Sequence, residues 1–253
     1  NLKKKMEFED LKRFIKNVPK TTHIHWTGYS EPLAHEDFDK FAIYLKDEGY
    51  RQLISTTMFG RRSTEKFMTE FNDFTSVTFH LPDNNNLMKL KVSDQYMITL
   101  EKAVRFQVKA GKKNVYYLTF GENFHPRISE LIKKLSNENI IDVKNIEVRK
   151  HLHSRNNAVD IAATNFSQEK KIIDFKKIKT DVYYCSYSRL NQGVLLPSGE
   201  VNLCCQDYSL SSSIGNLSEK KLPEMYKHKE MMNNGFTKGN DKFCKNCEYY
   251  QAL

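Results

Sequence analysis

Two hydrophobic periodicities alternate along the first 155 residues. Short runs rich in β-branched and aromatic residues, typical of strands, are separated by stretches with an apolar residue every three or four positions, typical of helices. The expected strands are 23–27, 52–58, 76–81, 114–120 and 143–152, and the expected helices are 6–17, 38–45, 67–71, 97–108 and 128–135. Such alternation indicates βαβ units and a parallel sheet, with ligand chemistry at the carboxyl ends of the strands.

The C-terminal part of the sequence follows a different pattern. Residues 156–184 combine a weak apolar periodicity with a basic run, and we interpret them as a connection. Residues 193–204 contain two short apolar runs around Pro197-Ser198-Gly199-Glu200, a turn sequence in which glycine accepts a positive φ. A β-hairpin is therefore expected here.

All five cysteines lie between positions 185 and 247. The hairpin is expected to bring Cys185 near Cys204, and the Cys244-Lys-Asn-Cys247 pair supplies two more thiolates from a second segment. Four converging thiolates indicate a zinc site or an iron–sulfur cluster. The alternative is a set of buried structural thiols or disulfides. Because neighbouring strand residues face opposite sides, we assign Cys204 as the ligand and Cys205 as a core thiol.

Composition and charge indicate the cellular compartment and the kinds of partner that this chain is expected to have. The chain has a formal charge of +9 and is 39% hydrophobic, but no apolar run approaches the length of a membrane span. The metal-type cysteine spacing and the lack of a signal-peptide pattern predict a reducing cytoplasm and no membrane association. We interpret the lysines mainly as solvated surface, with docking of an acidic partner as the alternative. No motif supports nucleic-acid binding.

The cysteine-rich segment resembles the auxiliary-cluster domain of radical S-adenosylmethionine enzymes, called SPASM in its long form and twitch in its short form. The motif stands in this sequence as Cys185, Gly199-x4-Cys204-Cys205, Asp207-Tyr208, Ile214-Gly215-Asn216-Leu217 and Cys244-x2-Cys247. A full SPASM domain continues with further cysteines after its C-x-x-C pair, and this sequence shows none there. The resemblance therefore implies a twitch-type domain with one 4Fe–4S cluster on Cys185, Cys204, Cys244 and Cys247.

The same resemblance assigns a cofactor loop to Gly28, Tyr29, Ser30, Glu31 and Pro32, which follow the first expected strand. In this family a "GGEP"-like loop holds the methionine amino group of S-adenosylmethionine. A carboxylate such as that of Glu31 accepts hydrogen bonds from an ammonium group. The alternative is an ordinary strand-ending turn, which uses Gly and Pro as well.

Further site residues are expected at other strand ends. Thr56 and Thr57 are similar to the "TNG"-type end of the third barrel strand, although threonine also favours strands in general. Thr119 is a candidate partner for a ribose hydroxyl. His80 is a candidate substrate ligand or base, or else a structural histidine. Arg155, in an "SNR"-like element, is a candidate active-site arginine, or else a surface residue.

The family's C-x3-C-x2-C motif, which binds the catalytic cluster, is missing from the sequence. That motif normally follows the first barrel strand, so we expect it upstream of Asn1. The resemblance thus implies an α/β fold: a partial (β/α)6 TIM-like barrel lacking its first strand, plus a small C-terminal cysteine-rich twitch/SPASM domain. The predicted domains are 1–155 for the barrel, 156–184 for the connection and 185–253 for the auxiliary-cluster domain.

The resemblance also implies a mechanism. A reduced catalytic cluster cleaves S-adenosylmethionine, the resulting 5′-deoxyadenosyl radical abstracts hydrogen from a substrate carbon, and the auxiliary 4Fe–4S cluster assists an oxidation. The expected substrate is a small molecule or a peptide, and the expected electron donor is a flavodoxin- or ferredoxin-type protein. The rival function is a non-catalytic four-cysteine zinc scaffold on a degenerate barrel.

Overall fold

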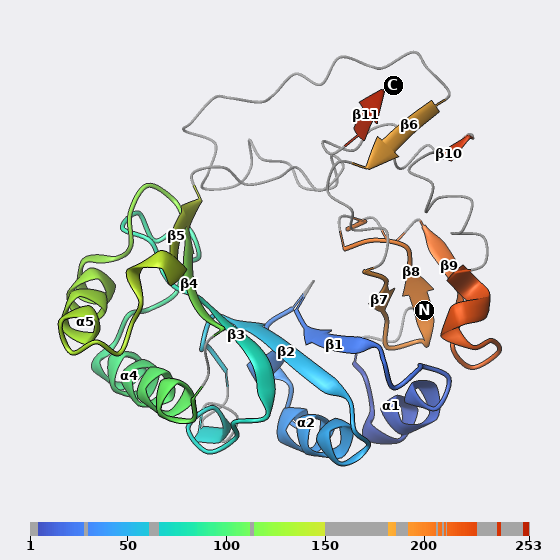
Figure 1. Cartoon of the computed structure of the whole chain (residues 1–253), viewed down its shortest axis with the longest axis horizontal. Coiled ribbons are helices and arrows are strands. Elements are labelled where there is room, and N and C mark those ends of the chain that lie inside the picture. The colour runs from blue at the N-terminus through green and yellow to red at the C-terminus, as the bar shows by residue number, and fades with distance from the viewer. Residues whose placement is uncertain are drawn as a thin grey trace. The chain divides into compact units, whose positions relative to one another are not determined.

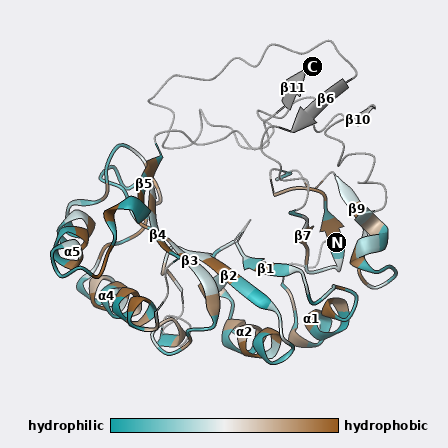
Figure 2. Ribbon diagram, in the orientation of Figure 1, coloured by the Kyte–Doolittle hydropathy of each residue, from teal (hydrophilic) through white to brown (hydrophobic). Residues whose placement is uncertain are grey.

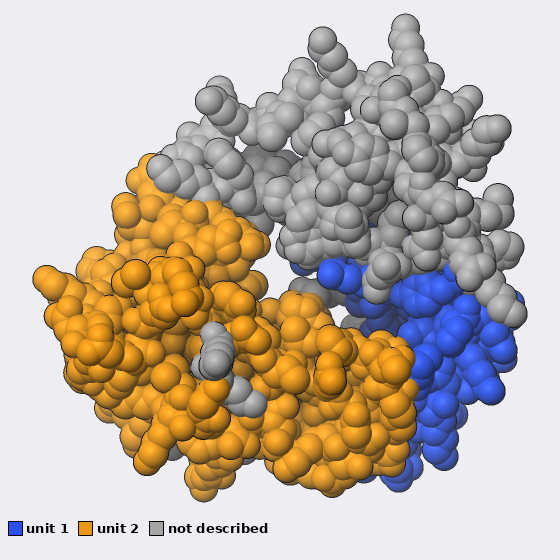
Figure 3. Space-filling view, viewed as in Figure 1, with its two compact units in different colours: residues 1–19, 153–253 blue, residues 20–152 orange. Residues whose placement is uncertain are grey.

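The computed structural model describes most of the chain (Figure 1). The described residues are 5–27, 30–60, 66–111, 114–149, 182–185, 192–205, 207, 208, 210, 212–226, 237, 238 and 250–252. The chain divides into two compact units, residues 20–152 and residues 1–19 with 153–253 (Figure 3). The division after residue 152 lies close to the predicted domain boundary at 155. Residues 1–19, assigned above to the barrel, instead group with the C-terminal unit.

The unit of residues 20–152 contains a parallel five-stranded sheet in the order β1-β2-β3-β4-β5. Its strands are β1 (His23–Trp26), β2 (Arg51–Thr56), β3 (Phe74–His80), β4 (Val115–Phe120) and β5 (Ile146–Arg149). Its helices are η1 (Pro32–Ala34), α2 (Phe38–Asp47), α4 (Asp94–Lys109), α5 (Pro126–Asn137) and η2 (Val143–Asn145). The expected α/β alternation and parallel sheet are confirmed, but residues 143–145, predicted as strand, form η2.

Helices α2, α4 and α5 lie along one face of this sheet (Figure 1). The strands bury alternate side chains toward that face, as in β2, where Gln52, Ile54 and Thr56 are buried and their neighbours are not. Strands and helices both mix hydrophobic and hydrophilic positions along their length (Figure 2). The core between the layers is rich in aromatic residues, including Phe79 and Tyr117, whose rings stack 5.9 Å apart.

Tyr117 carries a hydroxyl with no hydrogen-bond partner, although the residue is only 1% exposed. Burial raises the pKa of this phenol. Tyr117→Phe should leave the fold unchanged and raise the free energy of unfolding by about 1 kcal/mol, because a desolvated and unbonded polar group is removed. Tyr96→Phe is the matched control. The Tyr96 hydroxyl donates to Thr57 O at 2.9 Å, so this change should lower stability by a similar amount. Equal effects in urea unfolding would contradict this assignment.

Charged side chains clamp α4 to α5 on the surface. Glu101 accepts from Lys134 Nζ at 2.8 Å and from Arg105 Nη2 at 2.7 Å, and Arg105 Nη1 lies 2.6 Å from Glu138. The hydrogen bond from Lys134, followed by that from Arg105, holds the pKa of Glu101 below its usual range.

A carboxylate whose pKa is lowered by folding stabilises the protein above its unfolded-state pKa, about 4.3 for glutamate. That stabilisation is lost as the pH falls through the folded-state pKa. Glu101→Gln should therefore cost about 0.5–1 kcal/mol at pH 7, and the difference from the parent protein should vanish in more acidic buffer. Melting temperatures of the two proteins between pH 7 and pH 3 test this. A difference that stays constant with pH would contradict it.

The second unit contains helix α1 (Phe8–Ile15) and two small antiparallel sheets of three strands each. One sheet has the order β7-β8-β9, and the other has the order β10-β6-β11. Their strands are β6 (Val182–Cys185), β7 (Val194–Leu195), β8 (Glu200–Asn202), β9 (Ser213–Asn216), β10 (Thr237–Lys238) and β11 (Tyr250–Ala252).

The predicted hairpin is confirmed. Strands β7 and β8 pair antiparallel, Leu196 N donates to Glu200 O at 2.8 Å, and Gly199 has φ +88°. A side chain at Gly199 would be strained at that φ, and its Cβ would lie 2.7 Å from the Phe14 ring. Glycine at this position therefore allows the turn to form and allows Phe14 of α1 to pack closely against it.

Helix α1 belongs with the hairpin because of specific contacts. Asn17 Nδ2 donates to Leu217 O at 2.7 Å, and Leu222 N donates to Asn17 O at 2.8 Å. Phe14 and Leu11 are buried on its apolar side. The periodicity of residues 6–17 predicted this helix correctly but not which unit it packs in. Among the described residues, no helix has the length and apolarity needed to cross a membrane.

Candidate functional site

The loop that follows β1 is shaped around Glu31. Glu31 caps η1, and Pro32 occupies the first turn of that helix, where its missing N–H costs nothing. Of the five residues assigned to the cofactor loop, Ser30, Glu31 and Pro32 are described, and Gly28 and Tyr29 lie outside the described residues.

Both oxygens of the Glu31 carboxylate accept two hydrogen bonds each. Oε1 accepts from Thr56 Oγ1 at 2.6 Å and from Leu33 N at 3.1 Å. Oε2 accepts from the backbone N and from Oγ1 of Thr57, both at 2.7 Å. We call Glu31, Leu33, Thr56 and Thr57 the Glu31 latch. It fastens the loop after β1 to the end of β2, so the structure brings three of the predicted site residues together.

The latch leaves the Glu31 carboxylate little further capacity. An ionised carboxylate offers about four lone-pair positions, and protein donors fill four. Thr56 is 1% exposed on the helix-facing side, so it supports the latch from within the core. Glu31 and Thr56 therefore shape the loop, and any ammonium bound there requires other acceptors or an opened latch.

Thr119 does not present its hydroxyl to a ligand. The residue is fully buried on the helix-facing side of β4, and Oγ1 donates to Leu81 O at 2.8 Å. Strand alternation explains this placement, because Tyr117 and Thr119 share the core side. We therefore do not retain Thr119 as a ribose-binding residue.

The opposite side of the sheet, which we call the inner face, carries polar and aromatic side chains at the strand ends. His80 ends β3, Phe120 ends β4 and Arg149 ends β5. The His80 and Phe120 rings lie 5.7 Å apart edge to face, and the Arg149 guanidinium carbon lies 6.0 Å from the Phe120 ring centroid. Arg149 also forms an ion pair with Glu147 at 2.7 Å. The predicted His80 thus stands in a cluster with an aromatic surface and a cation.

Sequence reasoning missed the partners of His80. Phe120 and Arg149 were part of expected strands, and their position at the strand ends is the signal that would have singled them out. His25 was missed as well. Its Nε2 lies 2.9 Å from Ser55 Oγ, which joins β1 to β2 on the inner face. Arg155, the predicted active-site arginine, lies outside the described residues.

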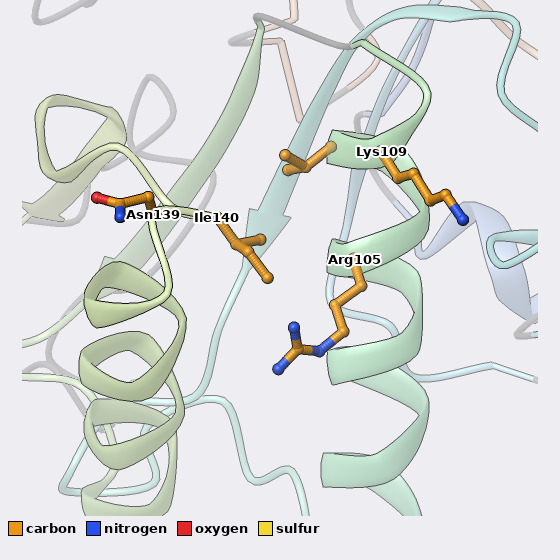
Figure 4. A pocket seen from close by; sticks show the side chains of 5 residues that line it. Arg105, Lys109, Asn139 and Ile140 are labelled. Atoms are coloured by element: carbon orange, nitrogen blue, oxygen red, sulfur yellow. The ribbon is translucent and has the colours of Figure 1, made fainter.

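A cavity of 350 Å³ lies between the carboxyl end of α4 and the residues after α5 (Figure 4). It is lined by Arg105, Val108, Lys109, Asn139 and Ile140. Arg105 is engaged by Glu101 and Glu138, and none of the predicted site residues lines the cavity. We assign this cavity no part in the site.

In the C-terminal unit the segment after β8 carries the vicinal thiols. Cys204 is 6% exposed and Cys205 is half-buried, so Cys205 is not the core thiol that we expected. Neither forms a disulfide. Asp207, fully buried, accepts from Ser212 N at 2.6 Å, and Asp207 N donates to Cys204 O at 3.2 Å. Asp207 therefore fixes the backbone around Cys204.

Tyr226 is hydrogen-bonded to the residue that precedes β7 in the same unit. Its hydroxyl oxygen accepts from Gly193 N at 3.1 Å, and burial raises the pKa of the phenol. Of the other predicted ligands, Cys185 ends β6, and Cys244 and Cys247 lie outside the described residues. Within the described ranges no three His, Cys, Asp or Glu side chains are grouped to hold a metal ion. The four-cysteine site thus stays a prediction.

Comparison with known proteins bears on both units. Residues 185–248 match the family model of SPASM, an iron–sulfur cluster-binding domain. The structure of native anSMEcpe with bound AdoMet is similar to this chain, with a TM-score of 0.54 and 15% identity over 96% of this chain and 78% of that one. The structure of BtrN in complex with AdoMet and 2-DOIA gives a TM-score of 0.49 and 15% identity over 96% and 80%. Among curated proteins, none matches.

The SPASM match agrees with the resemblance read from the cysteine spacing. At 15% identity, the likeness to anSMEcpe shows a shared fold, which agrees with the parallel α/β architecture predicted from the periodicity. Together, the two findings show an α/β fold shared with anSMEcpe and a SPASM-type segment at residues 185–248.

Proposed function

We propose that the chain is part of a radical S-adenosylmethionine enzyme, because residues 185–248 match the SPASM model of iron–sulfur cluster-binding domains. The SPASM match is the observation that carries the proposal. The parallel sheet, with its polar groups at the strand ends, is the kind of scaffold on which such chemistry is placed. S-adenosylmethionine and iron–sulfur clusters are the cofactors.

The residues around Cys204 fit an iron–sulfur cluster in chemistry. Thiolate is the usual ligand of such clusters, and Cys204 forms no disulfide and is well buried. The clamped turn at Asp207 supplies the rigidity that a ligand needs. We propose Cys185, Cys204, Cys244 and Cys247 as the ligand set of one auxiliary 4Fe–4S cluster, in a twitch-type domain.

For the sheet unit we propose a division of roles. The Glu31 latch shapes the loop of residues 28–32 so that its backbone groups hold the methionine part of S-adenosylmethionine, with Thr57 beside it. His80, Phe120 and Arg149 are placed to contact the substrate. An arginine over an aromatic ring favours a flat or anionic group, such as a carboxylate. Arg155 remains a candidate for the same region.

When bound, the cofactors supply reductive cleavage of S-adenosylmethionine and hydrogen abstraction from a substrate carbon. This chain's own residues bind the cofactors and the substrate, orient them, and exclude water from the site. We propose that the substrate is oxidised, either by dehydrogenation of a small molecule or by modification of a peptide. A flavodoxin- or ferredoxin-type protein would supply the electron for cleavage of S-adenosylmethionine. The formal charge of +9 suits an acidic electron donor.

The five cysteines of this sequence all lie in the segment proposed for the auxiliary cluster. Cysteines for a catalytic cluster therefore have to come from residues outside the printed sequence. The test uses protein made from the complete coding sequence, reconstituted anaerobically with iron and sulfide and reduced with dithionite. We expect mass spectrometry to detect 5′-deoxyadenosine from S-adenosylmethionine.

The rival function is a zinc scaffold with no catalytic cluster. It requires a coding sequence without a C-x3-C-x2-C motif and a purified protein with zinc and no sulfide. If both are found and no 5′-deoxyadenosine forms, the enzyme proposal is abandoned in favour of the scaffold.

A further inference from the structure

Asn202, the last residue of β8, has a buried side chain that the protein leaves unbonded. It is 1% exposed, and within the described part of the chain neither Nδ2 nor Oδ1 has a hydrogen-bond partner. Leaving a buried amide unbonded costs stability, so groups of this kind in folded proteins require an explanation. Its backbone pairs with Val194 of β7 and Ser213 of β9, and the register of β8 against β9 shifts between Val201 and Asn202.

The position of Asn202 supplies an explanation. Leu203 N donates to Ser212 O at 2.9 Å, so the chain stays beside the residues before β9 as it runs from β8 toward Cys204. The chain bends at Leu203, and Cys204 follows Asn202 by two residues. Cys204 is also buried, at 6% exposure. An unbonded amide and a proposed cluster ligand thus lie two residues apart in one short buried segment.

We propose that Asn202 donates a hydrogen bond from Nδ2 to a sulfur atom of the auxiliary cluster, either the Cys204 thiolate or an inorganic sulfide. This inference rests on the proposed function. An N–H donor stabilises the more negative, reduced form of an iron–sulfur cluster and so raises its reduction potential. Asn202 is then a positioning and tuning residue, and the amide that lacks a partner within the protein obtains one from the cluster.

Asn216 provides a matched control in the same sheet. Its Nδ2 donates to Ser198 O at 3.2 Å and its Oδ1 accepts from Ser218 N at 2.8 Å, so its amide is bonded within the protein. It lies on β9, opposite Glu200 of β8. Replacing this amide removes protein hydrogen bonds but no bond to the cluster.

The experiment compares the anaerobically reconstituted full chain with its Asn202→Leu and Asn216→Leu variants. Iron and sulfide per chain show whether the cluster is present, and EPR-monitored titration gives its midpoint potential. We expect Asn202→Leu to retain iron and to have a more negative potential than the parent, whereas Asn216→Leu retains the parent potential. An unchanged potential in iron-loaded Asn202→Leu overturns the proposal.

A measurement on the unsubstituted protein avoids dependence on how the variants fold. With ¹⁵N-labelled asparagine, the reduced cluster should show a hyperfine coupling to an asparagine nitrogen in pulsed EPR. Absence of that coupling overturns the role of Asn202 while the cluster itself is seen. A parent protein with no iron or sulfide instead overturns the proposed function, and this inference with it.

Discussion

Cys204→Ala should abolish retention of the auxiliary cluster. The remaining three thiolates leave one iron of a 4Fe–4S cluster without a cysteine ligand, and iron–sulfur clusters are held by all of their thiolates together. The buried thiol is replaced by a slightly smaller apolar group, so the expected loss of iron comes from coordination and not from a large cavity. Iron and sulfide per chain, measured after anaerobic reconstitution and desalting, should fall to background.

Cys205→Ala is the control, since Cys205 is the adjacent thiol and is half-buried. It should keep its iron and its visible absorption. If Cys205→Ala loses the cluster and Cys204→Ala retains it, the ligand assignment is reversed. Retention in both variants would mean that neither thiol is a ligand.

Glu31→Gln should disrupt the loop after β1 and weaken S-adenosylmethionine binding together. A glutamine presents one acceptor oxygen and one NH₂ group where the carboxylate has two acceptor oxygens. At least two of the four donors, those on Leu33, Thr56 and Thr57, then lose their acceptor. The expected cost in stability is about 2–3 kcal/mol, the scale of hydrogen bonds to a charged group.

Urea unfolding measures the stability of this variant, and calorimetry on protein made from the complete coding sequence measures its affinity for S-adenosylmethionine. Glu70→Gln is the control, because Glu70 is an exposed carboxylate of the same unit that forms an ion pair with Lys66. It should match the parent in both measurements. Thr57→Val removes a hydroxyl that donates to Glu31, and it should lower both stability and affinity for S-adenosylmethionine by part of the amount seen in Glu31→Gln. A Glu31→Gln protein of parental stability and affinity would show that the latch has no role.

The sequence predicted those features that local chemistry determines. Gly49 and Gly111 adopt positive φ values of 82° and 78° just after α2 and α4, a conformation typical of the residue that ends a helix. The turn at Gly199 follows from the same property. The other strands and helices were found in the expected order because their periodicities differ, but the helix expected at 67–71 is wrong, since residues 68–70 form a turn.

The features that could not be predicted from the sequence depend on contacts between residues far apart along the chain. Thr119 was proposed as a ligand because it lies near a strand end, but the phase of the strand, which sets the side that it faces, depends on packing against the helices. Helix α1 was assigned to the sheet unit because it precedes β1, whereas its partners Leu217 and Leu222 lie two hundred residues further on. The sequence did not single out Asn202, because only the structure shows that its amide is buried and unbonded within the described residues.

The most direct test of the account is the metal content of this chain, purified and reconstituted without oxygen. A chain that binds the auxiliary 4Fe–4S cluster should contain about four iron and four sulfide, show a brown colour with broad visible absorption, and give an EPR signal on reduction. A colourless protein with about one zinc per chain and no sulfide would contradict it.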